Sequence, residues 1–351
     1  MTIYWKLGIR PDERSLRAVA QEAAQLLRSG ELVAFPTETV YGLGADARNA
    51  AAVRRIFKAK GRPADNPLIV HVVDAAAAEA VADVGHPIAI RLMEAFWPGP
   101  LTLVLPAKPG AVAQEVTAGL ATVAVRVPSH PVALELIRAA GCPVAAPSAN
   151  RSGRPSPTTA DHVREDLDGL VAAVIDAGPT GIGLESTVVE PVDGGVRLLR
   201  PGGVPPEALR NVAGRVWWAS ADDASAPRSP GMKYAHYAPR GRLTLVSGGD
   251  PSAVYETICR ELREAKARGE VTGVLTVAER ADRYDADVVA VAGRAGDVGA
   301  TARELYAALR RFDEGGATYI LAEPFAEEGL GAAVMNRLRK AAGGREIRLD
   351  S

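Results

Sequence analysis

The chain has 351 residues, of which 47% are hydrophobic and 24% are charged, and its formal net charge is −1. This length favours two domains over one, because single cores stop growing well below it. The composition is that of an ordered globular protein and excludes a largely disordered chain. The near-zero net charge argues against binding to nucleic acid or anionic membranes by bulk attraction.

The apolar runs give no sign of a membrane or secreted protein. The N-terminal residues lack the apolar core of a signal peptide, and no apolar run reaches the length of a membrane span. Cys142 and Cys259 lie far apart beside apolar residues, and no Cys/His spacing suits zinc. We therefore expect a cytoplasmic protein with two buried thiols.

The first 210 residues mix helical and strand patterns. Apolar residues recur at helical spacing over 15–27, and Gly30 ends this helix before a strand begins at Leu32. Further helices are expected at 50–60 and 87–96, and further strands at 68–73, 101–105, 122–127, 144–146, 171–175 and 186–190. Because the patterns are mixed rather than strictly alternating, we predict an α/β domain with a mixed, partly antiparallel sheet.

The pattern breaks over 211–240, where Ala, Ser, Asp and Pro dominate, and this segment is predicted to be a linker. Beyond it, strands are expected at 243–246, 273–277, 288–291 and 318–321, and helices at 252–267, 301–312 and 331–342. These elements favour a small Rossmann-like α/β domain over 241–351. No G-x-G-x-x-G follows its first strand, so dinucleotide binding there is not expected.

Residues that carry chemistry gather in two clusters of the first half. The segment Phe35–Gly44 ends an apolar strand in a turn rich in Thr and Gly, and Lys60 and Arg62 stand one residue apart in a later turn. Another apolar run ends in Ser148 and Asn150. Cations, hydroxyls and close backbone approach are what a triphosphate requires. The sequence therefore predicts an enzyme that handles a nucleotide.

These motifs resemble the YrdC-type domain of threonylcarbamoyl-AMP synthases. The match rests on PTETVYGLG at 36–44, on the K-x-R and S-x-N pairs and on EST at 185–187. The segment 229–239 and the ending GLGAAVMNRL at 329–338 resemble the long, two-domain form of this family. The resemblance implies a YrdC-type catalytic domain over 1–210, a linker or lid over 211–240 and a Rossmann-like C-terminal domain over 241–351.

The resemblance also implies a reaction: L-threonine, bicarbonate and ATP yield threonylcarbamoyl-AMP and pyrophosphate. A separate complex then transfers the threonylcarbamoyl group to tRNA. In the first step, a carbamate of threonine attacks the α-phosphorus of ATP. Such an adenylyl transfer needs positioning and charge neutralisation rather than a catalytic triad. The implied enzyme class is a nucleotidyltransferase.

Lys60 and Arg62 are the candidate catalytic residues, because Gly61 and Pro63 form a turn that keeps both cations local. The simpler interpretation is a pair of solvated cations at a helix end. By resemblance, the ATP site comprises Lys60, Arg62, Asn66, Thr122, Ser148, Asn150, Ser156, Arg200 and one of Tyr234 or Tyr237. Mg²⁺ is expected with ATP, although no carboxylate cluster identifies its ligands.

Arg126 ends an apolar strand and is expected to bind the threonine carboxylate through two parallel hydrogen bonds. The alternative is a surface salt bridge on an edge strand. By resemblance, the threonine site also contains Thr39, His71, Ala146 and Ser186. His71 alone would be interpreted as a structural histidine. Glu38, as a general base or a turn cap, is left unassigned.

The segment 229–239 is rich in Pro, Gly and aromatic residues, which is unusual for a passive tether. Tyr234, His236 and Tyr237 offer flat polar faces suited to adenine or ribose, so we expect a lid over ATP. Aromatic residues that only attach the linker to the domains are the alternative. Many long-form relatives carry a basic residue where this chain has Ala235, which weakens the expectation of phosphate contacts from the linker.

Two other functions stay open at this point. YrdC-type domains have a concave basic surface, which raises RNA binding, but residues 1–210 carry 21 basic and 22 acidic residues, so such binding would be weak and local. The other is carbamoyl transfer in metalloenzyme maturation, whose architecture adds zinc-finger-like cysteines that two cysteines cannot supply. Adenylation is favoured over both.

Overall fold

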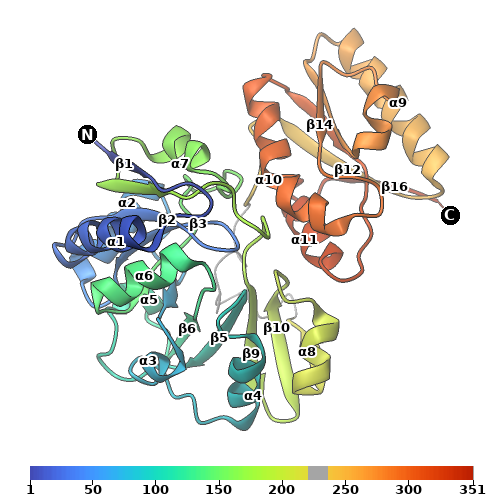
Figure 1. Cartoon of the computed structure of the whole chain (residues 1–351). Coiled ribbons are helices and arrows are strands. Elements are labelled where there is room, and N and C mark those ends of the chain that lie inside the picture. Colours follow the sequence, from blue (N-terminus) through green and yellow to red (C-terminus); the bar gives the residue numbers. More distant parts are fainter. Residues whose placement is uncertain (220–235, 351) are drawn as a thin grey trace. The chain divides into compact units, whose positions relative to one another are not determined.

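The computed structural model describes residues 1–219 and 236–350. The chain divides into two compact units, Met1–Ser152 with Ser156–Lys233 and Gly153–Pro155 with Tyr234–Ser351. Both are traced in Figure 1, and each is described here by itself. Within the described residues, no helix is long and apolar enough to cross a membrane.

The first unit is built on a mixed sheet, with strand order β1-β8-β2-β3-β7-β4-β6-β5-β9-β10-β11 over the described residues. The strands are β1 (Ile3–Lys6), β2 (Val33–Pro36), β3 (Tyr41–Asp46), β4 (Ile69–His71), β5 (Leu101–Pro106), β6 (Thr122–Arg126), β7 (Val144–Ala145), β8 (Ala173–Asp176), β9 (Thr187–Val192), β10 (Gly195–Arg200) and β11 (Arg215–Trp218). The helices are α1 (Glu13–Arg28), α2 (Ala50–Lys60), α3 (Ala75–Glu79), α4 (Pro87–Phe96), α5 (Gln114–Thr117), α6 (Pro131–Ala140), α7 (Ala160–Leu167) and α8 (Pro206–Ala213). Parallel and antiparallel pairs both occur, as the mixed sequence pattern predicts.

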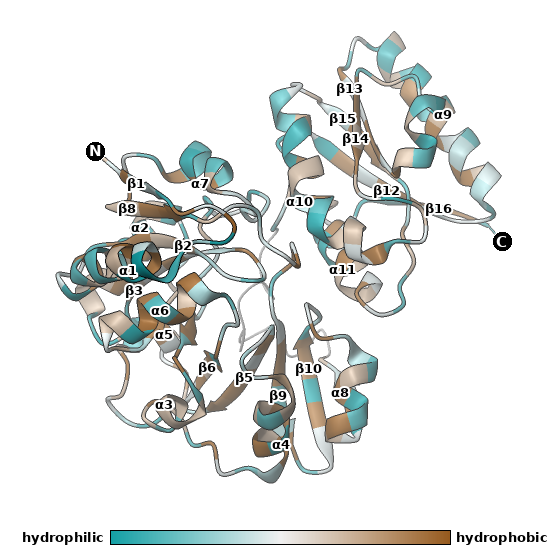
Figure 2. Ribbon diagram, viewed as in Figure 1, coloured by the Kyte–Doolittle hydropathy of each residue, from teal (hydrophilic) through white to brown (hydrophobic). Residues whose placement is uncertain are grey.

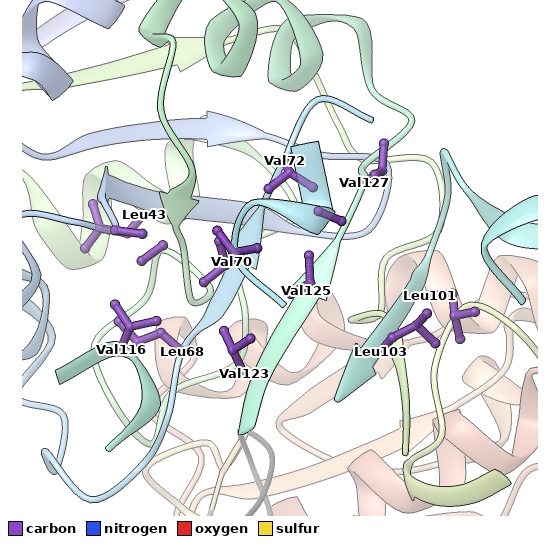
Figure 3. Close-up of a cluster of buried hydrophobic side chains, with 14 of the residues drawn as sticks. Leu43, Leu68, Val70, Val72, Leu101, Leu103, Val116, Val123, Val125 and Val127 are labelled. Carbon is purple, nitrogen blue, oxygen red and sulfur yellow. The ribbon is translucent and has the colours of Figure 1, made fainter. Parts of the chain in front are cut away.

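The main core lies on one face of the central strands. Figure 3 shows side chains of β3, β4, β5 and β6 meeting there, with Val70, Leu103 and Val125 among them. Because strand residues alternate between faces, Val123 and Val125 point into this core while the residues between and beside them point to the opposite face. The opposite face carries a small apolar cluster: Ile69, Val104, Ala124, Val188 and Leu199. This alternation decides which side chains of β4 and β6 are available for chemistry.

A second core holds α1 and α6 against the other strands. Ala24 and Leu27 of α1 pack with Val132 and Leu136 of α6, and all four are buried. The Asp12 side chain accepts a hydrogen bond from the backbone N–H of Ser15 and so caps the start of α1. Figure 2 shows the hydropathy of each residue. β8, which contributes Ala173 and Ile175 to this core, is mainly hydrophobic, whereas α7 is mainly hydrophilic.

The second unit has a parallel five-stranded sheet among its described residues, in the order β14-β13-β15-β12-β16. Its strands are β12 (Arg242–Gly248), β13 (Thr272–Thr276), β14 (Val288–Val291), β15 (Tyr319–Ala322) and β16 (Glu346–Leu349), and its helices are α9 (Pro251–Ala267), α10 (Val298–Glu314) and α11 (Gly331–Ala341). Figure 1 shows α9 on one side of this sheet and α10 and α11 on the other. This confirms the predicted Rossmann-like α/β architecture.

Two expectations need correction. The predicted linker 211–240 begins too early, because α8 runs to Ala213 and Arg215–Trp218 form β11, which pairs in parallel with β10. Residues 220–235, which hold most of the predicted lid, lie outside the described residues. Cys142 is buried as expected, but Cys259 is only half-buried, and both are free thiols.

Candidate active site

The ends of β4 and β6 bring two predicted site residues together. The strands are parallel, and His71 and Arg126, their last residues, are register partners. The turn Thr37–Thr39 follows β2 and carries the third member, Thr39. Arg126 is only 3% exposed, and its strand β6 lies between β4 and β5 in the sheet. The alternative of a surface salt bridge on an edge strand is therefore wrong.

Arg126 is the centre of this first cluster. Its Nη1 donates to Thr39 Oγ1 (3.0 Å), and its Nε donates to the carbonyl of Gly99 (3.2 Å). Its Nη2 forms an ion pair with Glu38 Oε1 at 2.6 Å. Thr39 Oγ1 also shares a 2.8 Å hydrogen bond with Thr37 Oγ1. A guanidinium fixed on three sides presents a planar donor group suited to a carboxylate.

His71 is buried, and its Nδ1 has no hydrogen-bond partner among the described residues. Burial, assisted by the positive charge of Arg126, lowers the pKa of His71 to about 3, so the ring is neutral at physiological pH. An unpaired buried ring nitrogen costs stability unless a ligand satisfies it. The histidine is therefore a candidate partner for a polar group of the substrate.

Ser186 and Arg200, predicted for different substrates, lie in direct contact. Arg200 Nη2 donates to the Ser186 carbonyl (2.9 Å) and to its Oγ (3.2 Å). Ser186 Oγ also shares a hydrogen bond of 2.7 Å with Thr102 Oγ1. Ser186 directly precedes β9, Arg200 ends β10, and all three side chains are buried. Ala146, which follows β7, is also buried, and its N–H donates to the Ile69 carbonyl.

Lys60 is the centre of the second cluster. It is the last residue of α2, and Gly61 ends that helix in the left-handed conformation (φ 62°), a backbone geometry that favours glycine. Lys60 Nζ donates to the carbonyls of Ser148 (2.6 Å) and Asn150 (2.5 Å). Burial, and then the nearby charge of Arg62, lowers the pKa of Lys60. Because the ammonium is buried, the interpretation of Lys60 as a solvated helix-end cation is wrong.

Arg62 and Asn66 occupy the loop that follows. Arg62 Nη2 donates to the carbonyls of Asn66 (3.2 Å) and Pro67 (3.0 Å), which holds the guanidinium over this loop. Asn66 is buried, and neither its Oδ1 nor its Nδ2 has a hydrogen-bond partner among the described residues. Two unpaired buried amide atoms indicate a position suited to hydrogen bonds with a polar ligand.

The loop after β7 supplies hydroxyl and amide groups. Ser148 Oγ donates to Asn150 Oδ1 (2.5 Å), and Asn150 Nδ2 donates to the Arg151 carbonyl (2.8 Å). Farther along, Ser156 Oγ donates to Glu185 Oε1 (2.5 Å), and both residues are buried. Ser148, Asn150 and Lys60 thus form one contact group, whereas Ser156 is tied to the segment before β9.

Backbone hydrogen bonds join the two clusters. The Tyr41 carbonyl accepts from the N–H of Ala149, and the Tyr41 N–H donates to the Pro157 carbonyl. The Thr39 carbonyl accepts from the N–H of Gly183. Tyr41, two residues after Thr39, is therefore bonded to the loop that carries Ser148 and Asn150, so the two clusters lie on neighbouring segments.

Thr122 stands apart from the rest. It begins β6, whereas Arg126 ends it, so the two residues lie about 13 Å apart along the strand. Both point to the sheet face that carries Ala124, because they are separated by even numbers of residues. A substrate that reaches both would have to be long, as the combination of threonine and ATP is.

The two predicted tyrosines fare differently. Tyr237 is buried in the second unit, where its ring stacks on Tyr306 (centroids 5.3 Å apart) and Arg337 lies over it. Tyr237 thus has packing partners within its own unit, and its contact with ATP stays a prediction. Tyr234 lies outside the described residues.

Glu38, which was left unassigned from the sequence, is a further candidate site residue. Both of its carboxylate oxygens are buried, and its ion pair with Arg126 gives the first cluster a negative group as well as a positive one. Its place in the turn between two threonines, at the end of a buried strand, was the available signal. Among the described residues, no group of three or more His, Cys, Asp or Glu side chains is arranged to hold a metal ion.

The chain is similar to known proteins over both of its domains. The sequence profile described as "Telomere recombination" matches residues 25–202, and that of "Threonylcarbamoyl-AMP synthase, C-terminal domain" matches residues 204–343. The threonylcarbamoyl-AMP synthase of Bacillus subtilis is 52% identical over 329 residues, which are 93% of this chain and 94% of that protein. That of Pyrococcus abyssi is 48% identical over 99% of this chain and 100% of its own length.

A solved structure is similar to this chain over nearly its whole length. The crystal structure of P. abyssi Sua5 complexed with L-threonine has a TM-score of 0.92 and 46% identity, covering 99% of this chain and 100% of that one. The resemblance seen in the motifs is thereby confirmed for both domains. The chain belongs to the threonylcarbamoyl-AMP synthase family, in its two-domain form.

Proposed function

We propose that this protein makes threonylcarbamoyl-AMP and pyrophosphate from L-threonine, bicarbonate and ATP. The observation that supports this proposal most strongly is a pair of neighbouring clusters. One contains the buried ion pair of Arg126 with Glu38, and the other is a cationic loop cluster centred on Lys60. The first group suits an amino acid and the second suits phosphates. The name of the closely similar proteins, threonylcarbamoyl-AMP synthase, supports the same reaction.

Threonine is recognised at the ends of β4 and β6. The guanidinium of Arg126 binds its carboxylate, and the carboxylate of Glu38 lies on the same side as an acceptor for its amine. Neutral His71 offers its Nδ1 to a further polar group of the substrate. Thr39 contacts Arg126 directly, and Ala146 and Ser186 are proposed as further threonine contacts.

ATP is held by the second cluster. Lys60 and Arg62 carry the positive charge that a triphosphate needs, and the amide of Asn66 and the hydroxyls of Ser148 and Ser156 supply hydrogen bonds. The other proposed ATP contacts are Thr122, Asn150, Arg200 and, outside the described residues, Tyr234. The threonine amine and bicarbonate form a carbamate with loss of water. The carbamate oxygen attacks the α-phosphorus, the bond from that phosphorus to the α,β-bridging oxygen breaks, and pyrophosphate leaves.

Mg²⁺ is proposed to accompany ATP. Ser156 and Glu185, joined by a hydrogen bond of 2.5 Å, provide oxygen atoms of the kind that Mg²⁺ prefers, and the triphosphate would supply the remaining ligands. When bound, the ion would neutralise phosphate charge. We further propose a cytoplasmic location, product transfer to a tRNA-modifying complex and at most weak RNA binding, in line with 21 basic and 22 acidic residues over 1–210.

The direct test is detection of the product. Purified protein with ATP, L-threonine and ¹³C-bicarbonate should yield threonylcarbamoyl-AMP that carries the label, identified by mass spectrometry without any tRNA present. Arg126→Ala should abolish it, while Arg138→Ala, which removes an exposed arginine paired with Glu135, should not. Unlabelled AMP as the sole nucleotide product would contradict the proposal.

A further inference from the structure

The second unit contains a cavity of about 400 Å³ that the proposed reaction does not use. Its walls include Gly248 and Ser252 at the end of β12 and the start of α9, Arg280 and Arg283 from the 3₁₀ helix after β13, and Glu323 just after β15. Each of these segments follows the carboxyl end of a parallel strand. In open α/β sheets, ligands bind outside that edge.

The position along this edge is also the one that topology favours. β12 and β15 are neighbours, but the chain leaves them in opposite directions: from β12 through α9 to β13, and from β15 through α11 to β16. Helices from neighbouring strands then lie on opposite faces and leave a crevice between the strand ends. Such a switch point is where doubly wound sheets bind their ligands. The cavity lies there, lined by residues that follow both strands.

The charged lining is net positive. Buried Glu323 accepts hydrogen bonds from Thr276 Oγ1 (2.9 Å), from the Tyr284 hydroxyl and from Arg280 Nε (2.8 Å) and Nη2 (2.5 Å). Arg280 is thereby fixed at the wall, and its Nη1 has no hydrogen-bond partner among residues 1–219 and 236–350. Glu323 thus neutralises one arginine and leaves the charge of the second uncompensated.

Arg283 is that second cation. Its guanidinium lies 4.1 Å from the centroid of the Tyr255 ring, and the Tyr255 hydroxyl donates to the Arg283 carbonyl (3.1 Å). Across the part of the chain that the structure describes, no carboxylate lies within ion-pair distance of it. Stacking on an aromatic ring holds a guanidinium in place while its edge stays available for a two-pronged contact.

Two features of this crevice argue against a nucleoside triphosphate as its ligand. Gly248 is required by packing, because a Cβ on it would lie 2.4 Å from the Leu349 carbonyl oxygen, so it is no sign of a phosphate loop. Asp250 Oδ1 already accepts from the N–H groups of Ser252 (2.8 Å) and Ala253 (2.9 Å) at the start of α9. The volume lies near the lower end of small-molecule sites, which span about 300–1,000 Å³.

We infer that this crevice binds a small organic anion, whose carboxylate or phosphate group is held by Arg283 and the free edge of Arg280. The site lies within the second unit and does not depend on the proposed reaction. A ligand there would act on the domain that carries no residue of the threonine cluster.

The test uses full-length protein with malonate and inorganic phosphate as probes. Hydrogen–deuterium exchange should slow in peptides covering 247–256, 278–286 and 321–326, and titration should give a saturable signal below about 10 mM. Arg283→Gln should weaken this at least about tenfold, the loss expected for one charge-assisted contact. Arg263→Gln, which removes an exposed arginine of α9 away from the cavity, should bind as wild type.

The two probes distinguish a carboxylate ligand from a phosphorylated one, and a further variant distinguishes the crevice from the cluster around Lys60. Slowed exchange with malonate alone assigns a carboxylate ligand, and with phosphate alone a phosphorylated one. Phosphate bound near Lys60 is distinguished by Arg62→Gln, which should leave the exchange of the three crevice peptides unchanged. The inference is overturned if neither probe protects these peptides, or if Arg283→Gln, with an unchanged melting temperature, binds like wild type.

Discussion

Arg126 Nη2 lies 2.6 Å from Glu38 Oε1 at the end of β6, so the residue expected to bind the threonine carboxylate already faces a carboxylate of its own chain. The pair matches a zwitterion: the guanidinium suits the carboxylate of an amino acid, and Glu38 suits its amine. Removing one partner of a buried ion pair leaves the other uncompensated. The two residues therefore have to be tested separately and conservatively.

Arg126→Lys should weaken threonine binding at least about tenfold and leave ATP affinity nearly unchanged. Lysine keeps the charge but cannot reproduce the two-pronged contact, nor the bonds to Thr39 and Gly99. Calorimetric titration with each substrate measures both affinities. Arg138→Lys, at an exposed position, is the matched control. Unchanged threonine affinity in Arg126→Lys would remove this residue from the site.

Glu38→Gln should also weaken threonine binding by about tenfold, because the amine loses its negatively charged partner while the side-chain shape is kept. Threonine methyl ester, which lacks the carboxylate, separates the two contacts: its binding should depend on Glu38 more than on Arg126. Tighter threonine binding in Glu38→Gln would mean that Glu38 competes with the substrate for Arg126, and the assigned role would be wrong.

Arg62→Gln and Lys60→Met should each lower the rate of adenylation by about 10²-fold or more, since each removes a preorganised positive charge from the phosphates. Only Lys60→Met should also lower the melting temperature, because Lys60 Nζ holds the carbonyls of Ser148 and Asn150. Lys58→Met, at an exposed position of the same helix, is the control for both readouts. Wild-type rates in Arg62→Gln would show that this cation does not contact the phosphates.

His71 should make the protein less stable in mild acid. Burial lowers the pKa of His71 from 6.5 to about 3. Between these two pH values the histidine is protonated in the unfolded chain but neutral in the folded protein. Above about pH 6.5 this difference has no effect on the free energy of unfolding. As pH falls from 6.5 toward 3, the free energy of unfolding decreases by about 1.4 kcal/mol per pH unit, which amounts to about 2 kcal/mol by pH 5. Urea unfolding at several pH values should show a shallower pH dependence for His71→Gln. An identical dependence would mean that His71 does not titrate as its burial implies.

Much of the fold follows from local patterns. The helices at 50–60 and 87–96 are found at those residues as α2 and α4, because an amphipathic pattern and end signals agree there. β3 was not predicted as a strand: residues 41–46 include two glycines, and their strand conformation comes from pairing with β2 and β7. β11 was assigned to the linker, because its exposed residues Trp217 and Trp218 directly precede a stretch rich in Ala, Ser, Asp and Pro.

The site residues likewise divide into those with a local signal in the sequence and those that depend on long-range contacts. Residue types and spacing predicted Lys60, Arg62 and Arg126, since a cation at a strand or helix end is visible in the sequence. The contact between Glu38 and Arg126 was not predictable, because the two residues are 88 positions apart in the chain and meet only in the folded domain. The burial of Tyr237 beside Tyr306 likewise depends on long-range packing, which no local pattern contains.

The central claim is tested most directly by pyrophosphate release from ATP with one substrate omitted at a time. The account predicts release only when L-threonine and bicarbonate are both present, with serine slower by about 10- to 200-fold for the lost methyl contact. Tracing the release continuously in one assay, with carbon dioxide excluded from the bicarbonate-free sample, makes the comparison quantitative. Turnover at the same rate without threonine would contradict the account.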